Sequence, residues 1–545
     1  MRRLFVRNFA PVMIVNWFPV IARFSPAIHK KTNPRSVMKR NVALYLSVCI
    51  YLTGCGRGLF TSAESSGWKG LAQYQVTCGP CDPSKANSGG GTGTLSDPYL
   101  VCSADQFKNI DTRCSPQSGW PAANFVQCAD LDLKGTSANP SSPVCLGSSF
   151  KGSYNGAGFA IKNFYYNNAA TDNVGVFATL SGASISNLTL KSPVIHGGNK
   201  VGGLAGEITA DASITSCVGS QISIQGAQHV GGLVGKITSD TCTTGNVVTG
   251  SSTSGTITSS DNWVGGLVGS NTGGGSGCQG IISYSSSSTQ VTTTGIIVGG
   301  LIGYVDTDGH ISHSYATGAV SGGFRVGGLI GFLDGNPHPS YLSDSFATGT
   351  ATASGDAAGG LVGMSDFGVI TNSYSTGNAA GTNQVGGFVG AIATCSFCTT
   401  AITSSYSTGS ATGTSQVGGF VGLIDDTVLT LSNSYSTGSA TGTSSTGGFM
   451  GELTTNTGAA STISNSYSIG AVSGSGGGFL GTQGSSTVIP SGCFWDKTTS
   501  GQTASTAGTG KTTSEMKTTS TFAGWPTLSA TDWTISSGSY PKLKW

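Results

Sequence analysis

A six-residue element, written Val-Gly-Gly-Leu-Val-Gly, recurs ten times and constrains the fold of this chain more than any other feature. It first appears at residues 201–206, and its fourth residue is Leu204, Leu233, Leu267, Leu301, Leu329, Leu361, Phe388, Phe420, Phe449 and Phe479. The spacing is about 27 to 34 residues, a period typical of repeat architectures in which each unit buries its apolar face against its neighbours. We therefore expect one elongated body rather than several globular domains.

A second element recurs within the same period, as in residues 370–377, Ile-Thr-Asn-Ser-Tyr-Ser-Thr-Gly. Strict alternation places Ile, Asn and Tyr on one face and the small hydroxyl residues on the other. Stacked coils would pile aromatic side chains into an inward column, at Tyr315, Phe346, Tyr374, Tyr406, Tyr435 and Tyr467. A polar column would lie two residues earlier, with like side chains bonded to one another, at His313, Asp344, Asn372, Ser404, Asn433 and Asn465.

These patterns predict an all-β fold, a parallel β-solenoid of about ten coils, which we expect by analogy to be right-handed. Only 9% of the residues are charged, too few for ordinary solvated helices, while the regular apolar positions argue against disorder. Open solenoid ends invite aggregation, so both ends should be capped. We divide the chain into an upstream segment with a signal peptide (1–54), a flexible Gly/Ser-rich tether (55–93), a disulfide-rich cap with the first strands (94–172), the repeats (173–492) and a C-terminal cap (493–545).

The N-terminal segment has the order of residues found in a secretory signal. Met38-Lys39-Arg40 precedes an apolar run from Val42 to Leu52, and Leu-Thr-Gly-Cys ends at Cys55. The sequence around Cys55 is similar to a bacterial lipobox, which would make Cys55 the lipid attachment site and the mature amino terminus. Translation could begin at Met1 or at Met38, and the protein would be lipid-anchored in the cell envelope, at the outer membrane or the cell surface.

The formal net charge of +2 depends on that segment, because the first 54 residues hold nine of the 26 Lys and Arg and no acidic residue. Without them 17 basic residues face 24 acidic ones, a net charge of −7. A chain of that sign repels nucleic acid, so no nucleic-acid partner is expected.

Twelve cysteines remain after Cys49 in the signal and Cys55, and in an exported chain they predict disulfides. Six fall before the repeats, with fifteen possible pairings, at Cys78, Cys81, Cys102, Cys114, Cys128 and Cys145. We favour a local bond between Cys78 and Cys81 over a redox site. Among the repeats, Cys395 and Cys398 share a loop, and cross-links between coils are open to Cys217, Cys242 and Cys278.

The Gly-Leu-x-Gly element resembles the GLUG motif of bacterial, adhesin-like surface proteins. The lead-in, with Asp130-Leu131-Asp132-Leu133 and residues 150–161, is similar to that family's beginning, although Asn155 and Ala157 depart from it. The tail is similar as well, with Phe494-Trp495-Asp496 and the ending Tyr540-Pro541-Lys542-Leu543-Lys544-Trp545. The resemblance covers about residue 94 to the end and implies a fold, while the motif implies no particular chemistry.

Acidic residues in the variable loops are the candidate site, because stacked coils would set them along one edge. They are Asp306, Asp308, Asp334, Asp366, Asp425 and Asp426. They could bind Ca²⁺ or a sugar, or act as paired carboxylates on a glycan. We favour the alternative that Asp occurs in turns because it bonds its own backbone, and we expect no cofactor and no metal.

Three functions remain. We prefer an adhesin-like binding or surface-display protein whose ligand is a glycan or a surface protein and whose lipid lies in the membrane. A polysaccharide hydrolase or lyase on a β-helix is the second, since enzyme activity is not excluded, and a passive envelope spacer is the third.

Overall fold

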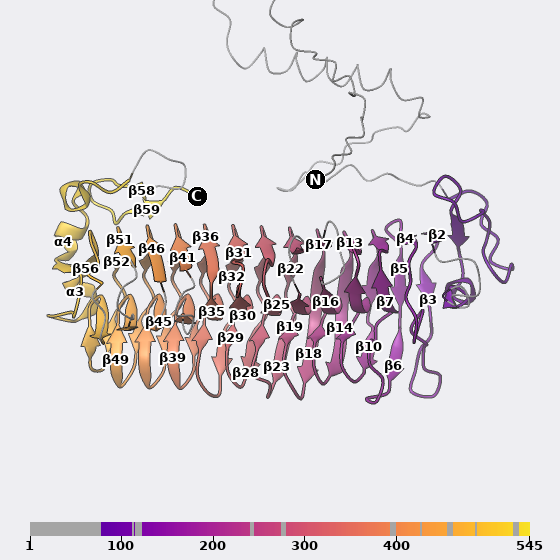
Figure 1. Ribbon diagram of the computed structural model, residues 1–545, viewed down its shortest axis with the longest axis horizontal. Coiled ribbons are helices and arrows are strands. Elements are labelled where there is room, and N and C mark those ends of the chain that lie inside the picture. The colour runs from indigo at the N-terminus through magenta and orange to yellow at the C-terminus, as the bar shows by residue number, and fades with distance from the viewer. Residues whose placement is uncertain are drawn as a thin grey trace, which may run out of the picture. The chain divides into compact units, whose positions relative to one another are not determined.

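The computed structural model describes residues 78–545 apart from 112–113, 115–121, 240–244, 274–278, 393–398, 426–427, 455–460, 485–487 and 527–532. Cys55, the signal, Cys242, Cys278, Cys395, Cys398 and Asp426 lie outside the described residues. The described residues form a parallel β-solenoid, so the predicted fold class is confirmed (Figure 1). Its handedness stays a prediction.

One repeat is one coil, as the unit from residue 298 to 322 shows. It consists of β24 (Val298–Gly299), β25 (Ile302–Val305), β26 (His310–Ser312), β27 (Tyr315–Ala316) and β28 (Val320–Gly322). Each strand pairs in parallel with its equivalent in the next coil, β29 (Val326–Gly327), β30 (Ile330–Asp334), β31 (Ser340–Ser343), β32 (Phe346–Ala347) and β33 (Ala351–Ala353). Equivalent residues of successive repeats therefore lie in columns along the body.

Four long sheets result from this stacking. The 10-stranded sheet runs from β11 (Val201–Gly202) to β54 (Gly476–Gly477), one strand for each repeated element. The 11-stranded sheet runs from β7 (Phe177–Ser181) to β55 (Leu480–Gln483), and the 13-stranded sheet from β1 (Tyr99–Val101) to β51 (Thr462–Ser464). The 23-stranded sheet holds two or more strands of most coils, from β3 (Leu131–Asp132) to β57 (Thr509–Lys511). The stack exceeds the ten predicted coils because the strands of the N-terminal cap already belong to it.

The repeated element makes a tight corner between the 10- and 11-stranded sheets. Its first and fourth residues both point into the core; Val201 and Leu204 are fully buried. A Cβ on Gly202 would overlap the carbonyl oxygen of Ala205 and lie 2.6 Å from that of Leu233 in the next coil. Glycine is thus required by close backbone approach. None of the glycines of the element takes positive φ; the residue before the element does so in eight of the ten copies, as at Lys200 (57°).

The predicted aromatic column exists, but it lies on the outside of the coil rather than in the core. The rings from Tyr315 to Tyr467 stack with centroids 4.8 to 5.2 Å apart and planes within 6° of parallel. All are half-buried except Tyr467, which is buried. The inward aromatic stack is the one formed by Phe388, Phe420, Phe449 and Phe479, at 4.5 to 4.8 Å.

A left-handed residue two positions before each aromatic ring explains this correction. Asn372 has a φ of 47° and its equivalents have φ between 48° and 52°. Strand alternation is interrupted at this corner, so that Ile370 and Ser373 point inward while Tyr374 points outward. The expected polar column therefore lies at a surface corner, where Asn372 Nδ2 donates to Asp344 Oδ1 at 3.2 Å.

A buried serine ladder takes the place that we assigned to the polar column. The serine before each outward aromatic residue is buried; the backbone N–H of Ser314, for example, donates to Ser345 Oγ (3.1 Å) and its own hydroxyl donates to the carbonyl of Ser312 (2.8 Å). The ladder comprises Ser251, Ser285, Ser314, Ser345, Ser373, Ser405, Ser434 and Ser466. Cys217 and Cys493 lie at its two ends as free, buried thiols, and burial raises the pKa of each to about 12. Of the three cysteines open to cross-links between coils, Cys217 is therefore free, and the expectation of disulfides at all twelve cysteines is wrong.

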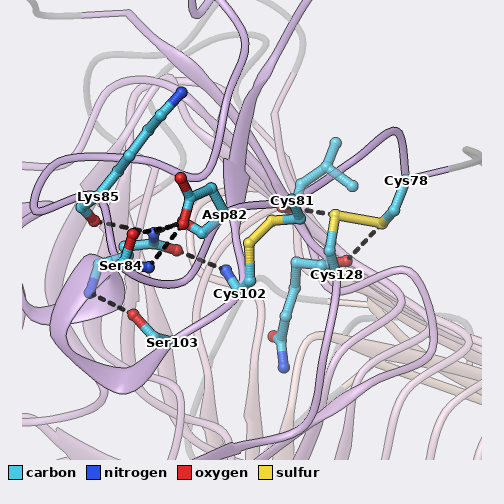
Figure 2. Close-up of a disulfide and its surroundings, with 11 residues drawn as sticks. Cys78, Cys81, Asp82, Ser84, Lys85, Cys102, Ser103 and Cys128 are labelled. Carbon is cyan, nitrogen blue, oxygen red and sulfur yellow. Dashed lines mark hydrogen bonds between the residues drawn. A yellow bond between two sulfur atoms is a disulfide. The ribbon is translucent and has the colours of Figure 1, made fainter.

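Three disulfides close the N-terminal cap, which contains helix α2 (Ala104–Lys108). Cys78 is joined to Cys128 and Cys81 to Cys102, so the local bond expected between Cys78 and Cys81 is wrong (Figure 2). The third bond joins Cys114 to Cys145. Cys102 follows β1 and Cys128 follows β2 (Asn124–Gln127) at the next position in register. Residues 78–81 therefore strap the ends of two neighbouring strands.

The C-terminal cap continues the 23-stranded sheet with β56 (Phe494–Asp496) and β57 and then covers it. It adds helices α3 (Lys497–Ser500) and α4 (Thr513–Met516), the 3₁₀ helix η4 (Thr519–Phe522) and a hairpin of β58 (Trp533–Thr534) and β59 (Lys542–Leu543). A cluster with Tyr467 is formed by Met516, Phe522, Trp525, Trp533 and Leu543. No helix of the described residues is long and apolar enough to cross a membrane.

Candidate functional site

The acidic residues do gather at one edge, where strands of the 11-stranded sheet end. Asp334, the last residue of β30, lies directly opposite Asp366 of β35 (Val362–Asp366). The same register sets Asp306, which follows β25, beside Asp334, and Asp425 ends β45 (Val421–Asp425) further along. Asp308 lies in the turn after Asp306, with a φ of 58°.

The carboxylates of Asp306 and Asp334 accept hydrogen bonds both from their own turns and from the neighbouring coil. Asp306 accepts from the backbone N–H of Thr307 (2.9 Å) and of Gly273 (3.3 Å). Asp334 accepts from the Asn336 N–H (3.1 Å) and from the Tyr304 hydroxyl (3.0 Å). Aspartate that bonds backbone N–H groups within its own turn is the structural role that we favoured for this edge.

Two observations bear on whether this edge could catalyse glycoside hydrolysis or bind a metal ion. Burial raises the pKa of Asp334, and the nearby Asp306 carboxylate adds to that rise. Glycoside hydrolysis requires a carboxyl group with a raised pKa beside an ionised carboxylate. However, both oxygens of Asp334 already accept hydrogen bonds, from Tyr304 and Asn336. Among the described residues no group of three or more His, Cys, Asp or Glu side chains is placed to hold a metal ion.

The outward face of the 23-stranded sheet has a different character, because it carries hydroxyl groups in columns. One column contains Thr317, Thr348, Thr376, Thr408 and Thr437; a second, four residues later in each coil, contains Ser321, Thr352, Ala380, Thr412 and Thr441. Between them lie Ala319, Thr350, Asn378, Ser410 and Ser439, where Ser439 donates to Ser410 at 2.9 Å. None of these fifteen positions, all of them described, is charged.

A further outward feature lies beside the repeated element. In two coils the left-handed residue before the element contacts the residue seven positions later: the Arg325 guanidinium lies 4.7 Å from the ring centroid of Phe332, and Lys200 forms an ion pair with Glu207 (2.9 Å). His229 in the next coil stacks on Trp263 with centroids 4.5 Å apart, and its Nδ1 lies 2.6 Å from Ser270 Oγ. Burial lowers the pKa of His229 to about 4, with the positive charges of Lys236 and Lys200 acting in the same direction.

The fold is a β-solenoid, and one of its coils carries a GLUG motif. A sequence model of the GLUG motif matches residues 294–321, which span one coil from β24 into β28, so the resemblance drawn from the repeats is confirmed. The motif is thus one rung of the solenoid.

Two known proteins are similar to parts of this chain. A halomucin of Haloquadratum walsbyi is 33% identical over 138 residues, which are 24% of this chain and 1% of the halomucin. The crystal structure of a candidate immunoglobulin A1 protease from Bacteroides ovatus aligns over 84% of this chain and 94% of the protease chain, with a TM-score of 0.30 and 15% sequence identity.

Proposed function

We propose that this chain is an adhesin-like binding protein, anchored in the cell envelope by lipid on Cys55, which presents the hydroxyl columns of its 23-stranded sheet to a glycan or a surface protein. The observation that carries the proposal is the charge-free hydroxyl face described above. Serine and threonine hydroxyls both donate and accept hydrogen bonds, and they suit the hydroxyl groups of a glycan. Repetition at the strand spacing of about 4.8 Å offers the same shallow face many times, which favours multivalent contact.

Binding is tested with the full chain on arrays of glycans and of extracellular proteins. Thr412→Lys with Thr441→Lys places two charges in neighbouring coils of the hydroxyl face, and both side chains are exposed. A matched control, Thr430→Lys with Thr462→Lys, places the same charges in neighbouring coils of the 13-stranded sheet. The proposal predicts saturable binding that the first pair abolishes and the second leaves intact. Equal binding by both variants would show that the hydroxyl columns are not the binding face. The absence of any binding would favour a passive envelope spacer.

The anchor needs a test of its own. Growth with a clickable palmitate analogue should label the full chain and not its Cys55→Ser variant. Protease treatment of intact cells should then release the body from the surface. Labelling that persists in the variant, or protection of the body in intact cells, would contradict the anchor or the surface location respectively.

A further inference from the structure

The outward aromatic ladder offers only part of each ring to a ligand. Because every ring stacks on its neighbours 4.8 to 5.2 Å away, the faces of the inner rungs are occupied. The ring edges and the tyrosine hydroxyls face away from the coil. A molecule that binds this ladder must therefore contact ring edges along a column.

The chain's own tail shows what such a column can hold. The ring of Trp545 lies over Tyr374 and Tyr406, with centroids 6.2 and 5.6 Å apart, and is tilted by 37° and 35°. Trp533 contacts Tyr435 and Tyr467 in the same way, at 5.9 and 5.8 Å. The rings of the two tryptophans thus contact four successive rungs. In Figure 1 the C-terminus lies near β36 (Gly368–Thr371) and β41 (Thr399–Thr403), which precede Tyr374 and Tyr406 in their coils.

Polar contacts fix the tail on the ladder. The Tyr467 hydroxyl donates to the carbonyl of Pro541 at 2.7 Å, and the indole N–H of Trp533 donates to Asn433 Oδ1 at the corner column, at 3.4 Å. Burial under this tail raises the pKa of Tyr406 to about 12. The ladder therefore binds a hairpin through aromatic rings, a backbone carbonyl and an indole N–H.

Phe346 and Tyr315 continue the same ladder beyond the ring contacts of the tail. Both are half-buried, and the stack ends at Tyr315 because Ser286 stands in register in the preceding coil. Their corner column has an exposed carboxylate, Asp344, where the covered rungs have neutral residues such as Asn433. One oxygen of Asp344 accepts from Asn372 (3.2 Å), and the other lies 4.0 Å from His313 Nε2. The tail itself is basic at Lys542 and Lys544, so the chemistry of a bound segment is matched by an acidic group here.

We propose that Tyr315 and Phe346, with Asp344, bind a short hairpin of another protein that carries aromatic and basic side chains, as the tail hairpin binds the neighbouring rungs. The inference names a partner for the binding function proposed above and rests on it. The bound surface is continuous with an interface that the molecule already makes with its own residues 533–545.

The test uses the full chain and a fluorescein-labelled peptide with the sequence of residues 533–545, followed by fluorescence anisotropy. Tyr315→Ser with Phe346→Ser repeats the residue found at this position in the preceding coil, Ser286, and should weaken binding tenfold or more, about 1.4 kcal/mol. Val218→Ser is the matched control, since Val218 lies in the same column outside the ladder, with 37% of its surface exposed, and it should bind as the parent does. Asp344→Asn should weaken binding and reduce its dependence on salt.

Five results would overturn the inference. The first two are no binding at millimolar peptide and equal binding by the double variant. The third is sensitivity to Tyr435→Ser in place of Tyr315→Ser and Phe346→Ser, which would mean exchange with the tail. The fourth is a dimer of the full chain that the double variant abolishes, which would make a second copy the occupant. A chitohexaose arm that bound in place of the peptide would overturn it in favour of sugar. Hydrogen exchange of coils 298–392 checks that each variant is folded. If array binding through the hydroxyl columns persists while peptide binding fails, this inference falls alone and the proposed function stands.

Discussion

Replacement of Phe420 by alanine should open the solenoid locally and measurably. Phe420 is fully buried and stacks on Phe388 and Phe449 with centroids 4.5 and 4.8 Å away. Loss of a buried phenylalanine costs about 3–5 kcal/mol, from the transfer of the ring and the cavity that remains. Two stacked contacts, each worth about 0.5–1.5 kcal/mol beyond area burial, place this site in the upper half of that range.

The chain provides the matched control, because the equivalent position is leucine in the first six repeats. Phe420→Leu keeps an apolar group of a size that the coil accepts and should cost no more than about 1.5 kcal/mol. Because a solenoid's stability is a sum of local terms, hydrogen exchange of peptides from residues 385–451 is the appropriate measurement. Phe420→Ala should accelerate exchange there by about a thousandfold, which corresponds to about 4 kcal/mol. A loss under about 1 kcal/mol for alanine, or equal losses for alanine and leucine, would refute the assignment of this column to the core.

Three further predictions concern the corner, the cap and the outer histidine. Gly418→Ala should prevent normal folding of the surrounding coils, because its Cβ would overlap the carbonyl oxygen of Val421. Gly79→Ala should be tolerated, because no atom lies within 4 Å of the added Cβ. Circular dichroism and hydrogen exchange would distinguish the two variants, and a stable Gly418→Ala chain would contradict the corner geometry. Loss of the Cys78–Cys128 bond by double alanine substitution should destabilise the cap by about 4 kcal/mol, and loss of the Cys81–Cys102 bond by about 3 kcal/mol. The first bond closes the longer loop, because its sequence separation is 50 and that of the second is 21, and a longer closed loop restricts the unfolded chain more. Hydrogen-exchange rates in the cap that reversed this order would contradict the loop-closure argument. The pKa of His229 is about 4 in the folded chain and about 6.5 in the unfolded chain, so the unfolded chain binds the proton first as the pH falls. The free energy of unfolding should therefore fall by at most about 3 kcal/mol between pH 6.5 and pH 4. His229→Gln should flatten this pH dependence in chemical denaturation, and an unchanged pH dependence would assign the titration to another group.

The sequence predicted the period, the parallel stacking and the register, because ten copies of one glycine-rich element leave few other ways to bury their apolar residues. It also placed the acidic residues at one edge. It misplaced the aromatic column, since strand alternation was extended through a corner. Asn372 was the available signal, because asparagine is among the few residues that adopt positive φ readily, and such a residue resets which side chains face inward.

Other features depend on contacts that no local pattern encodes. The partners of Cys78 and Cys81 follow from which strand ends the first residues cross, a matter of tertiary path. The tail was expected to cover the end of the stack, and Trp525 does so, but Trp545 packs on the outward rings of Tyr374 and Tyr406. The buried serine ladder could have been found, because Ser precedes the aromatic residue in every unit from Tyr315 to Tyr467.

Distances between spin labels test the central claim, that each unit of about thirty residues is one rung. Labels introduced as non-natural amino acids at Thr258 and Thr441 lie six rungs apart in one column, and labels at Thr292 and Thr412 lie four rungs apart. At about 4.8 Å per rung, double electron–electron resonance should give backbone separations of about 29 Å and about 19 Å, although 183 and 120 residues separate the two positions in sequence. Distances that do not grow by one strand spacing per repeat would contradict the solenoid and the column arrangement on which the proposed binding faces depend.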